Sequence, residues 1–155
     1  MDDKKTETLQ KARAYAFLLL KYRLRSEKEL GERLKRKKFD EATVKDTLAF
    51  LKEKDFIDDK VFARAWIDSR LRKPLGLRKI KQELKAKGIS PEITDKIFDS
   101  LKAGYSEKDT VEKIFKDRFA RLKNIDPEKA KRRIYAYLLR RGFSGEAIIE
   151  AMHKL

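Results

Sequence analysis

The sequence predicts an all-α protein, a tandem array of three three-helix repeats that is elongated and curved. Apolar residues recur at three- and four-residue intervals along the chain, which is the period of an amphipathic helix. Strand signals are nearly absent, and the 155 residues include only 6 glycines and 3 prolines. The same pattern also occurs three times. Because a single unit of ~50 residues buries little surface, we expect neighbouring units to stack.

The internal repeat is seen when the segments after Ser26, Gly76 and Pro127 are aligned, at offsets of 50 and 54 residues. The matched apolar positions are Leu30, Ile80 and Ile134; Leu34, Leu84 and Leu138; Phe39, Ile89 and Phe143; Leu48, Phe98 and Met152; and Leu51, Leu101 and Leu155. After the third of these positions comes a helix N-cap residue, namely Asp40, Ser90 or Ser144. We therefore expect repeats at 1–57, 58–104 and 105–155.

Helix start signals divide each repeat into three helices. Ser26 and Glu29 have the spacing of a capping box, and Pro91 and Pro127 each follow a capping residue, where proline is favoured. The helices are expected at 8–24, 27–37, 41–54, 59–72, 77–87, 91–102, 107–122, 128–141 and 145–154.

The second helices end differently in the first repeat. Gly88 and Gly142 follow two of them, and glycine readily adopts the left-handed conformation that ends a helix. Lys38 occupies this position in the first repeat, where a left-handed lysine costs on the order of 1 kcal/mol. Either this helix ends differently, or the lysine is kept for its charge.

Residues suited to catalysis or metal binding are scarce. There is no cysteine, and His153 is the only histidine. The adjacent carboxylates Asp58 and Asp59 point in different directions on a helix, and no glycine-rich phosphate-binding loop is present. We therefore expect a protein that is not an enzyme and has no cofactor and no metal.

No membrane association is expected either. The longest apolar run, Ala14 to Leu20, falls short of the ~20 residues that span a bilayer. The polar start at residues 1–5 is unlike a signal peptide. The expected location is the cytoplasm.

The net charge of +15 is spread evenly, with +5 on each expected repeat. Such a field favours polyanionic or acidic partners. The second helix of each repeat is the most basic element, and in a stacked array these helices would form one continuous stripe. The candidate partner- or DNA-binding residues are Arg25, Arg33, Arg36, Lys37, Arg64, Arg70, Arg72, Lys73, Arg78, Lys79, Lys81, Lys131, Arg132, Arg140 and Arg141. The alternative is that these side chains only form the solvent-exposed helix faces opposite the core.

The aromatic residues have spacings typical of core positions rather than of a base-stacking surface. The ones expected in the core are Tyr15, Phe17, Phe50, Phe62, Trp66, Phe98, Phe115 and Phe119.

Several motifs, in order along nearly the whole chain, resemble the RecX family. They are the stretch Ala16 to Leu34; Phe56-Ile57-Asp58-Asp59 followed by Phe62-Ala63-Arg64-Ala65-Trp66; Gly76-Leu77-Arg78-Lys79-Ile80, with Glu83-Leu84 and Lys87-Gly88; Asp126-Pro127-Glu128-Lys129; and Arg140-Arg141-Gly142-Phe143. Lys38 departs from the glycine expected in the first repeat.

The resemblance implies a stack of three-helix repeats without cofactor or catalytic activity. It also implies binding in the groove of the RecA filament on single-stranded DNA, with restraint of filament growth. We expect a monomer. The alternative is a general helical protein that binds single- or double-stranded nucleic acid without a protein target.

Overall fold

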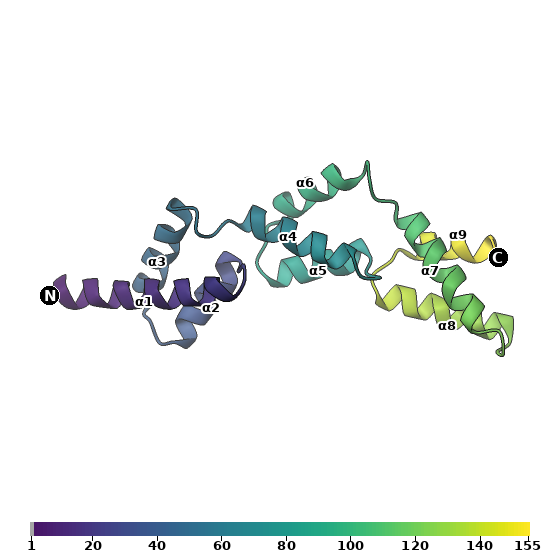
Figure 1. The fold of residues 1–155 in the computed structure, drawn as a ribbon, viewed down its shortest axis with the longest axis horizontal. Coiled ribbons are helices and arrows are strands. Elements are labelled where there is room, and N and C mark those ends of the chain that lie inside the picture. The colour runs from purple at the N-terminus through teal and green to yellow at the C-terminus, as the bar shows by residue number, and fades with distance from the viewer. Residues whose placement is uncertain (1) are drawn as a thin grey trace. The chain divides into compact units, whose positions relative to one another are not determined.

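The computed structural model describes residues 2–155, which form nine α-helices and no strand (Figure 1). The helices are α1 (Asp2–Tyr22), α2 (Glu27–Arg36), α3 (Glu41–Glu53), α4 (Asp59–Leu71), α5 (Leu77–Ala86), α6 (Pro91–Leu101), α7 (Glu107–Arg121), α8 (Pro127–Arg140) and α9 (Gly145–His153). The predicted all-α fold of three-helix repeats is confirmed, whereas the elongated, curved shape stays a prediction.

The expected start of the first helix at residue 8 is wrong, because α1 begins at Asp2. Its first two turns are polar and almost entirely exposed, so they carry no apolar period that marks them as helical. Acidic residues in the first turn, Asp2 and Asp3, interact favourably with the partial positive charge of a helix N-terminus.

Several of the other predicted helix starts are confirmed by capping hydrogen bonds. The capping box is complete: the Ser26 hydroxyl accepts from the Glu29 N–H, and the Glu29 carboxylate accepts from the Ser26 N–H. Asp40, Ser90 and Ser144 each accept a bond from the N–H three residues on. α6 and α8 begin at the two prolines.

By compactness the chain divides into two units, and the second repeat contributes to both. The N-terminal unit contains residues up to Ala65 together with Lys85–Ile93, and the C-terminal unit contains Trp66–Leu84 and Thr94–Leu155. A repeat of this size completes its core with parts of its neighbour. The repeat boundaries after residues 57 and 104 stay a prediction.

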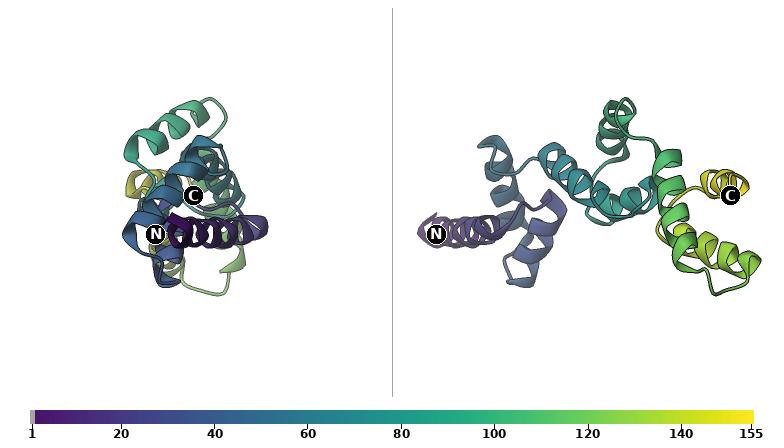
Figure 2. Two further views of the ribbon diagram at one scale, coloured as in Figure 1. Left: turned by 90° about the vertical axis from the view of Figure 1, so that its left-hand side faces the viewer. Right: turned by 45° about the vertical axis from the view of Figure 1, so that its right-hand side comes forward.

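The core of the N-terminal unit lies between α1, α2 and α3, which stay together in both views of Figure 2. The buried side chains form two clusters: Ala16, Leu19, Leu30, Leu51 and Ile57 in one, and Ala12, Leu34 and Val44 in the other. α1 contributes small residues at its contacts, which lets the shorter helices approach closely.

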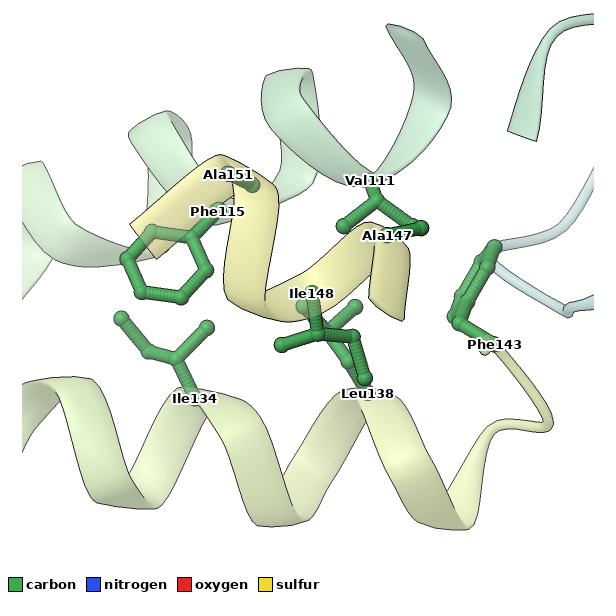
Figure 3. Close-up of a cluster of buried hydrophobic side chains, with 8 residues drawn as sticks. All are labelled: Val111, Phe115, Ile134, Leu138, Phe143, Ala147, Ile148 and Ala151. Carbon is green, nitrogen blue, oxygen red and sulfur yellow. The ribbon is translucent and has the colours of Figure 1, made fainter. Parts of the chain in front are cut away.

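The core of the C-terminal unit gathers between α7, α8 and α9 (Figure 3). Phe115 of α7 points toward Ile134 of α8, and Phe143 closes the end of the cluster beside Ala147. These side chains stabilise the unit by about 25 cal/mol for each Å² of apolar surface removed from water.

The matched repeat positions lie inside, with one clear exception. Leu30, Ile80 and Ile134 are buried, as are Leu34, Leu84 and Leu138. Leu155 is 47% exposed at the end of the chain. Among the aromatics, the prediction for Phe17 is wrong: its ring is 37% exposed and packs edge-on against exposed Phe56, with the centroids 4.7 Å apart.

Each unit contains a joint where the end of one second helix meets the start of the preceding second helix. In the first joint, within the N-terminal unit, the Ser26 hydroxyl donates to the Lys87 carbonyl at 2.7 Å. The Lys28 amine donates to the Ala86 carbonyl at 3.2 Å. Gly88 then turns with a φ of 78°, and a Cβ there would lie 2.6 Å from the Cβ of Lys28.

The second joint, within the C-terminal unit, has the same plan. The backbone N–H of Gly76 donates to the Arg141 carbonyl at 2.8 Å, and the Arg141 guanidinium donates to the Pro74 carbonyl at 3.1 Å. Gly142 has a φ of 88° and lies against Lys79. Glycine is needed after each helix both for its conformation and for the close approach.

Lys38 ends α2 with a φ of 71°, so the first of the two possibilities for this residue is wrong: the helix ends as the others do. Its side chain is exposed, and among residues 2–155 no preceding second helix lies against it. The steric reason for glycine at this position is therefore absent in the first repeat, which leaves only the conformational cost.

Candidate functional site

Several carboxylates of the described chain cap helices or form ion pairs. Asp58 accepts from the N–H of Lys60, whereas Asp59 accepts from the N–H of Glu27. Burial raises the pKa of Asp59, against the lowering effect of that hydrogen bond. Within residues 2–155, no group of three or more His, Cys, Asp or Glu side chains is placed to hold a metal ion, and no helix is long and apolar enough to cross a membrane.

Several predicted basic residues are held by partners inside their own unit. Arg70 donates to Glu83 at 2.8 Å and stacks on Trp66, whose indole N–H donates to the same carboxylate oxygen. Lys81 pairs with Asp95 at 3.2 Å, and Lys131 lies 4.0 Å from Glu128. Lys37 lies over the ring of Tyr15 and Arg141 over that of Tyr137. These contacts reduce the charge or freedom available for a partner.

Other candidates have no ion pair among the described residues. They are Arg25, Arg33, Arg36, Arg64, Arg72, Lys73, Arg78, Lys79, Arg132 and Arg140. The C-terminal unit brings Arg141 beside Pro74, next in sequence to Lys73, so the basic residues of two repeats meet at the second joint. The continuous stripe over all three repeats stays a prediction.

Four arginines of the N-terminal unit lie together around one surface hollow. A hollow of about 200 Å³ is lined by Arg23, Arg25, Glu29, Glu32, Arg33 and Arg36. Residues of α2 at these positions share one helix face because they are three or four apart. Arg23 and Arg25 reach it from the segment between α1 and α2. We call this the arginine hollow.

The two glutamates of the arginine hollow do not neutralise it. Glu29 is shared by two cations: the Arg23 guanidinium donates two bonds of 3.1 Å, and the Lys87 amine donates at 2.6 Å. Burial raises the pKa of Glu29, but these bonds outweigh it and bring the pKa to about 2. Glu32 has only Lys28 at 4.0 Å. Among the described residues, Arg33 and Arg36 have no carboxylate within ion-pair distance.

Arg25 is half-buried beside these cations and donates to the Leu19 carbonyl at 3.4 Å. Burial lowers the pKa of its guanidinium, and the neighbouring charges of Arg23 and Arg33 lower it further. The hollow therefore holds four guanidinium groups against two carboxylates, and one of these carboxylates is shared with Lys87.

In the other two repeats, the position that corresponds to Arg33 is covered by an arginine of the same repeat. Counting from the buried positions, Arg33 corresponds to Glu83 and Tyr137. Arg70 of the first helix covers Glu83, and Arg118 lies 3.4 Å over the ring of Tyr137. α1 has the buried Leu19 where α4 and α7 have these arginines. Within residues 2–155, no arginine of the first helix covers Arg33 in the first repeat.

Two residues of this region were missed as sequence candidates. Arg23 lines the arginine hollow, and Tyr22 just before it is 77% exposed at the end of α1. The signal in the sequence is the pair Arg23 and Arg25, which flanks a single residue immediately before a capping box.

This fold and surface define a class: a protein of three-helix repeats with arginine- and lysine-rich second helices. Three stretches of the chain match the domains of RecX in order. Residues 12–51 match its first three-helix domain, 58–96 its second and 106–152 its third. The chain therefore belongs to the RecX family.

Curated relatives support this assignment along the whole chain. The regulatory protein RecX of Chlorobium phaeobacteroides (strain BS1) is 37% identical over 155 residues, which is 99% of this chain and 95% of the relative. That of Mycobacterium sp. (strain JLS) is 34% identical over 149 residues, covering 92% and 80% of the two chains. Their name supports a role as a RecX regulator.

Solved structures show the same fold. A crystal structure of regulatory protein RecX has a TM-score of 0.84 at 21% identity and covers 98% of this chain and 76% of its own. The crystal structure of RecX from Lactobacillus salivarius has a TM-score of 0.83 at 21% identity and covers 97% of both chains.

Proposed function

We propose that the protein is a non-enzymatic regulator that binds the RecA–single-stranded DNA filament in its groove and restrains filament growth and recombinase activity. The observation that carries this proposal is the match of three successive RecX domains along the chain. As a cytoplasmic monomer, the protein would contact RecA and the DNA within or beside the filament through its basic side chains.

The charge distribution supports a polyanionic target. A net charge of +15, with many arginines and lysines free of carboxylate partners, attracts both acidic protein surface and DNA phosphate. Cations already paired with internal carboxylates, such as Arg70, contribute less, because a partner must compete with Glu83 for them.

The test is growth of RecA filaments on fluorescent single-stranded DNA, with and without the purified full-length protein. We expect growth to slow in proportion to the added protein, because a protein lodged in the groove blocks the addition or retention of subunits. Unaltered growth at saturating protein would contradict the proposal.

The second candidate function is general nucleic-acid binding without a protein target, which the net charge favours. Binding to bare and to RecA-coated single strands across a salt series separates the two. Phosphate-driven binding weakens steeply with salt, with a slope of roughly −0.7 for each phosphate neutralised on a single strand. A preference for coated DNA that survives moderate salt supports the filament regulator, and equal loss on both substrates supports the general binder.

A further inference from the structure

We propose that the arginine hollow of the N-terminal unit binds a backbone phosphate of single-stranded nucleic acid, and that exposed Tyr22 stacks on a neighbouring base. This inference rests on the proposed function for the identity of the strand. It assigns the DNA contact to one side of α2 and to the segment before it. The basic side chains of the other repeats would then serve other contacts.

The first argument is the chemistry of the cluster. Guanidinium groups present donors in a planar fork that matches the oxygens of a phosphate. Arg33 and Arg36 lie one helical turn apart on α2, and neither has an acceptor among the described residues. Arg25 adds a third guanidinium from a different segment, so the donors converge from two sides of the arginine hollow.

The second argument is that the arginine hollow is held in shape by contacts that a ligand need not break. Glu29 fixes Arg23 through two hydrogen bonds and is itself held by Lys87 and by the capping box. Arg23 is therefore already ordered and loses little side-chain entropy when an anion arrives. The remaining arginines are the ones that an incoming phosphate would engage.

The third argument distinguishes a nucleic-acid strand from an acidic peptide. Tyr22 is the next residue before Arg23, and its 77% exposure exceeds that of the other large apolar side chains on the surface of the described chain. The carboxylates of an acidic peptide offer no flat face on which this ring can stack, whereas single-stranded DNA binders commonly combine a basic groove with stacking aromatics.

The test measures binding of the full-length protein to a fluorescein-labelled thymidine oligonucleotide across a salt series. The variant Arg33→Gln with Arg36→Gln is expected to bind at least about tenfold more weakly. The salt slope should become shallower by about 0.7 for each phosphate that the variant no longer neutralises. Tyr22→Ala, which removes no charge, is expected to weaken binding about fivefold or more.

Two controls show whether the effect belongs to the arginine hollow. Lys45→Gln with Lys54→Gln removes the same charge from exposed positions on or next to α3 in the same unit, and should weaken binding less than about threefold. Arg33→Lys with Arg36→Lys keeps the charge but loses the fork, and should give an intermediate affinity. Circular dichroism confirms that every variant retains its helices.

The outcomes separate the possible partners. If Arg33→Gln with Arg36→Gln and Lys45→Gln with Lys54→Gln weaken DNA binding equally, the proposal is overturned. The proposal is also overturned if binding depends on the arginines but is unchanged in Tyr22→Ala, and if polyglutamate competes as well as DNA does. That result would assign the arginine hollow to an acidic peptide.

Filament growth assayed with the same proteins tells the two proposals apart. If the wild-type protein slows RecA filaments while the hollow variants bind DNA like the control, this inference fails and the proposed function stands. If the oligonucleotide results are as expected but filament growth is unaffected, the reverse holds.

Discussion

The two joints connect second helices at equivalent positions of the repeat but through different contacts. In the first, a serine side chain reaches the carbonyl before the left-handed residue, and an ion cluster of Arg23, Glu29 and Lys87 surrounds it. In the second, the backbone N–H of Gly76 makes the equivalent bond. The repeat therefore sets where the two helices meet, whereas the residue at the start of the earlier helix, Ser26 or Gly76, sets how closely their backbones approach. We therefore expect substitutions that remove charge to destabilise the first joint, and substitutions that add side-chain volume to destabilise the second.

The largest expected effect comes from giving the second joint the residue of the first, with Gly76→Ser. A Cβ at Gly76 would lie 2.2 Å from the Gly142 carbonyl oxygen, so the backbone must move. We expect the free energy of unfolding to fall by about 3 kcal/mol or more, measured by urea denaturation of the full chain.

The matched control for that change is Gly104→Ser. A Cβ there has no atom within 4 Å, so the change should be within about 0.5 kcal/mol. Equal urea midpoints for the two variants would show that the second joint adjusts easily, and the two joints would then not differ in their response to volume.

The next effect is expected from Ser26→Ala in the first joint. Ser26 is fully buried and its hydroxyl both caps α2 and donates to Lys87, so its removal should cost about 2 kcal/mol. Ser106→Ala removes a cap of α7 that is exposed and makes no such joint contact, and should cost about 1 kcal/mol. Thermal unfolding of both variants measures the difference, and equal losses would mean that the Lys87 bond adds nothing.

The helices and their caps could be predicted from the sequence because they depend on local rules. The repeat alignment placed Leu34, Leu84 and Leu138 in the core, and all three are buried. The early start of α1 was not predicted because exposed polar turns have no apolar period. The division into two compact units was not predicted either, since it depends on which parts of the second repeat pack with each neighbour.

The arginine hollow could be predicted only in part. The sequence predicts Arg33 and Arg36 as basic residues of the most basic element and Arg25 as a basic residue just before it, but composition does not show which cations have partners. Glu83 looks like a lone acid in a basic helix, and only the fold brings it to Arg70 and Trp66. The contrast with Arg33, which has no such partner, follows from tertiary contacts between the first and second helices.

A smaller effect, dependent on pH, should distinguish the first joint through Glu29→Gln. The folded pKa of Glu29 is about 2, below its ordinary value of 4.5. Its stabilisation is therefore complete above pH 4.5 and is lost as the pH falls toward 2. Near pH 7 we expect the variant to be less stable by about 1.5 kcal/mol, roughly half of what the shift implies, because Arg23 is 46% exposed and solvent screens its charge.

The measurement is urea denaturation of wild type and variant from pH 7 down to pH 2, where the difference between them should vanish. Glu32→Gln removes the same charge from the same helix, but this side chain is 54% exposed and only 4.0 Å from its lysine, so its curve should follow that of the wild type. A difference for Glu29→Gln that stays constant with pH would show that the ion cluster does not hold the first joint.

The smallest expected effect is a gain in stability from Lys38→Gly. Lys38 has a left-handed φ of 71°, as Gly88 and Gly142 do at the joints, but meets no neighbouring second helix. Glycine should relieve about 1 kcal/mol of backbone strain, less the entropy of a more flexible unfolded chain. Lys37→Gly, one residue earlier at an ordinary φ of −76°, offers no strain to relieve and should leave stability equal or lower. If both variants lose stability alike, Lys38 is held by a favourable contact, and glycine at the joints reflects backbone conformation less than the close approach of Lys28 and Lys79.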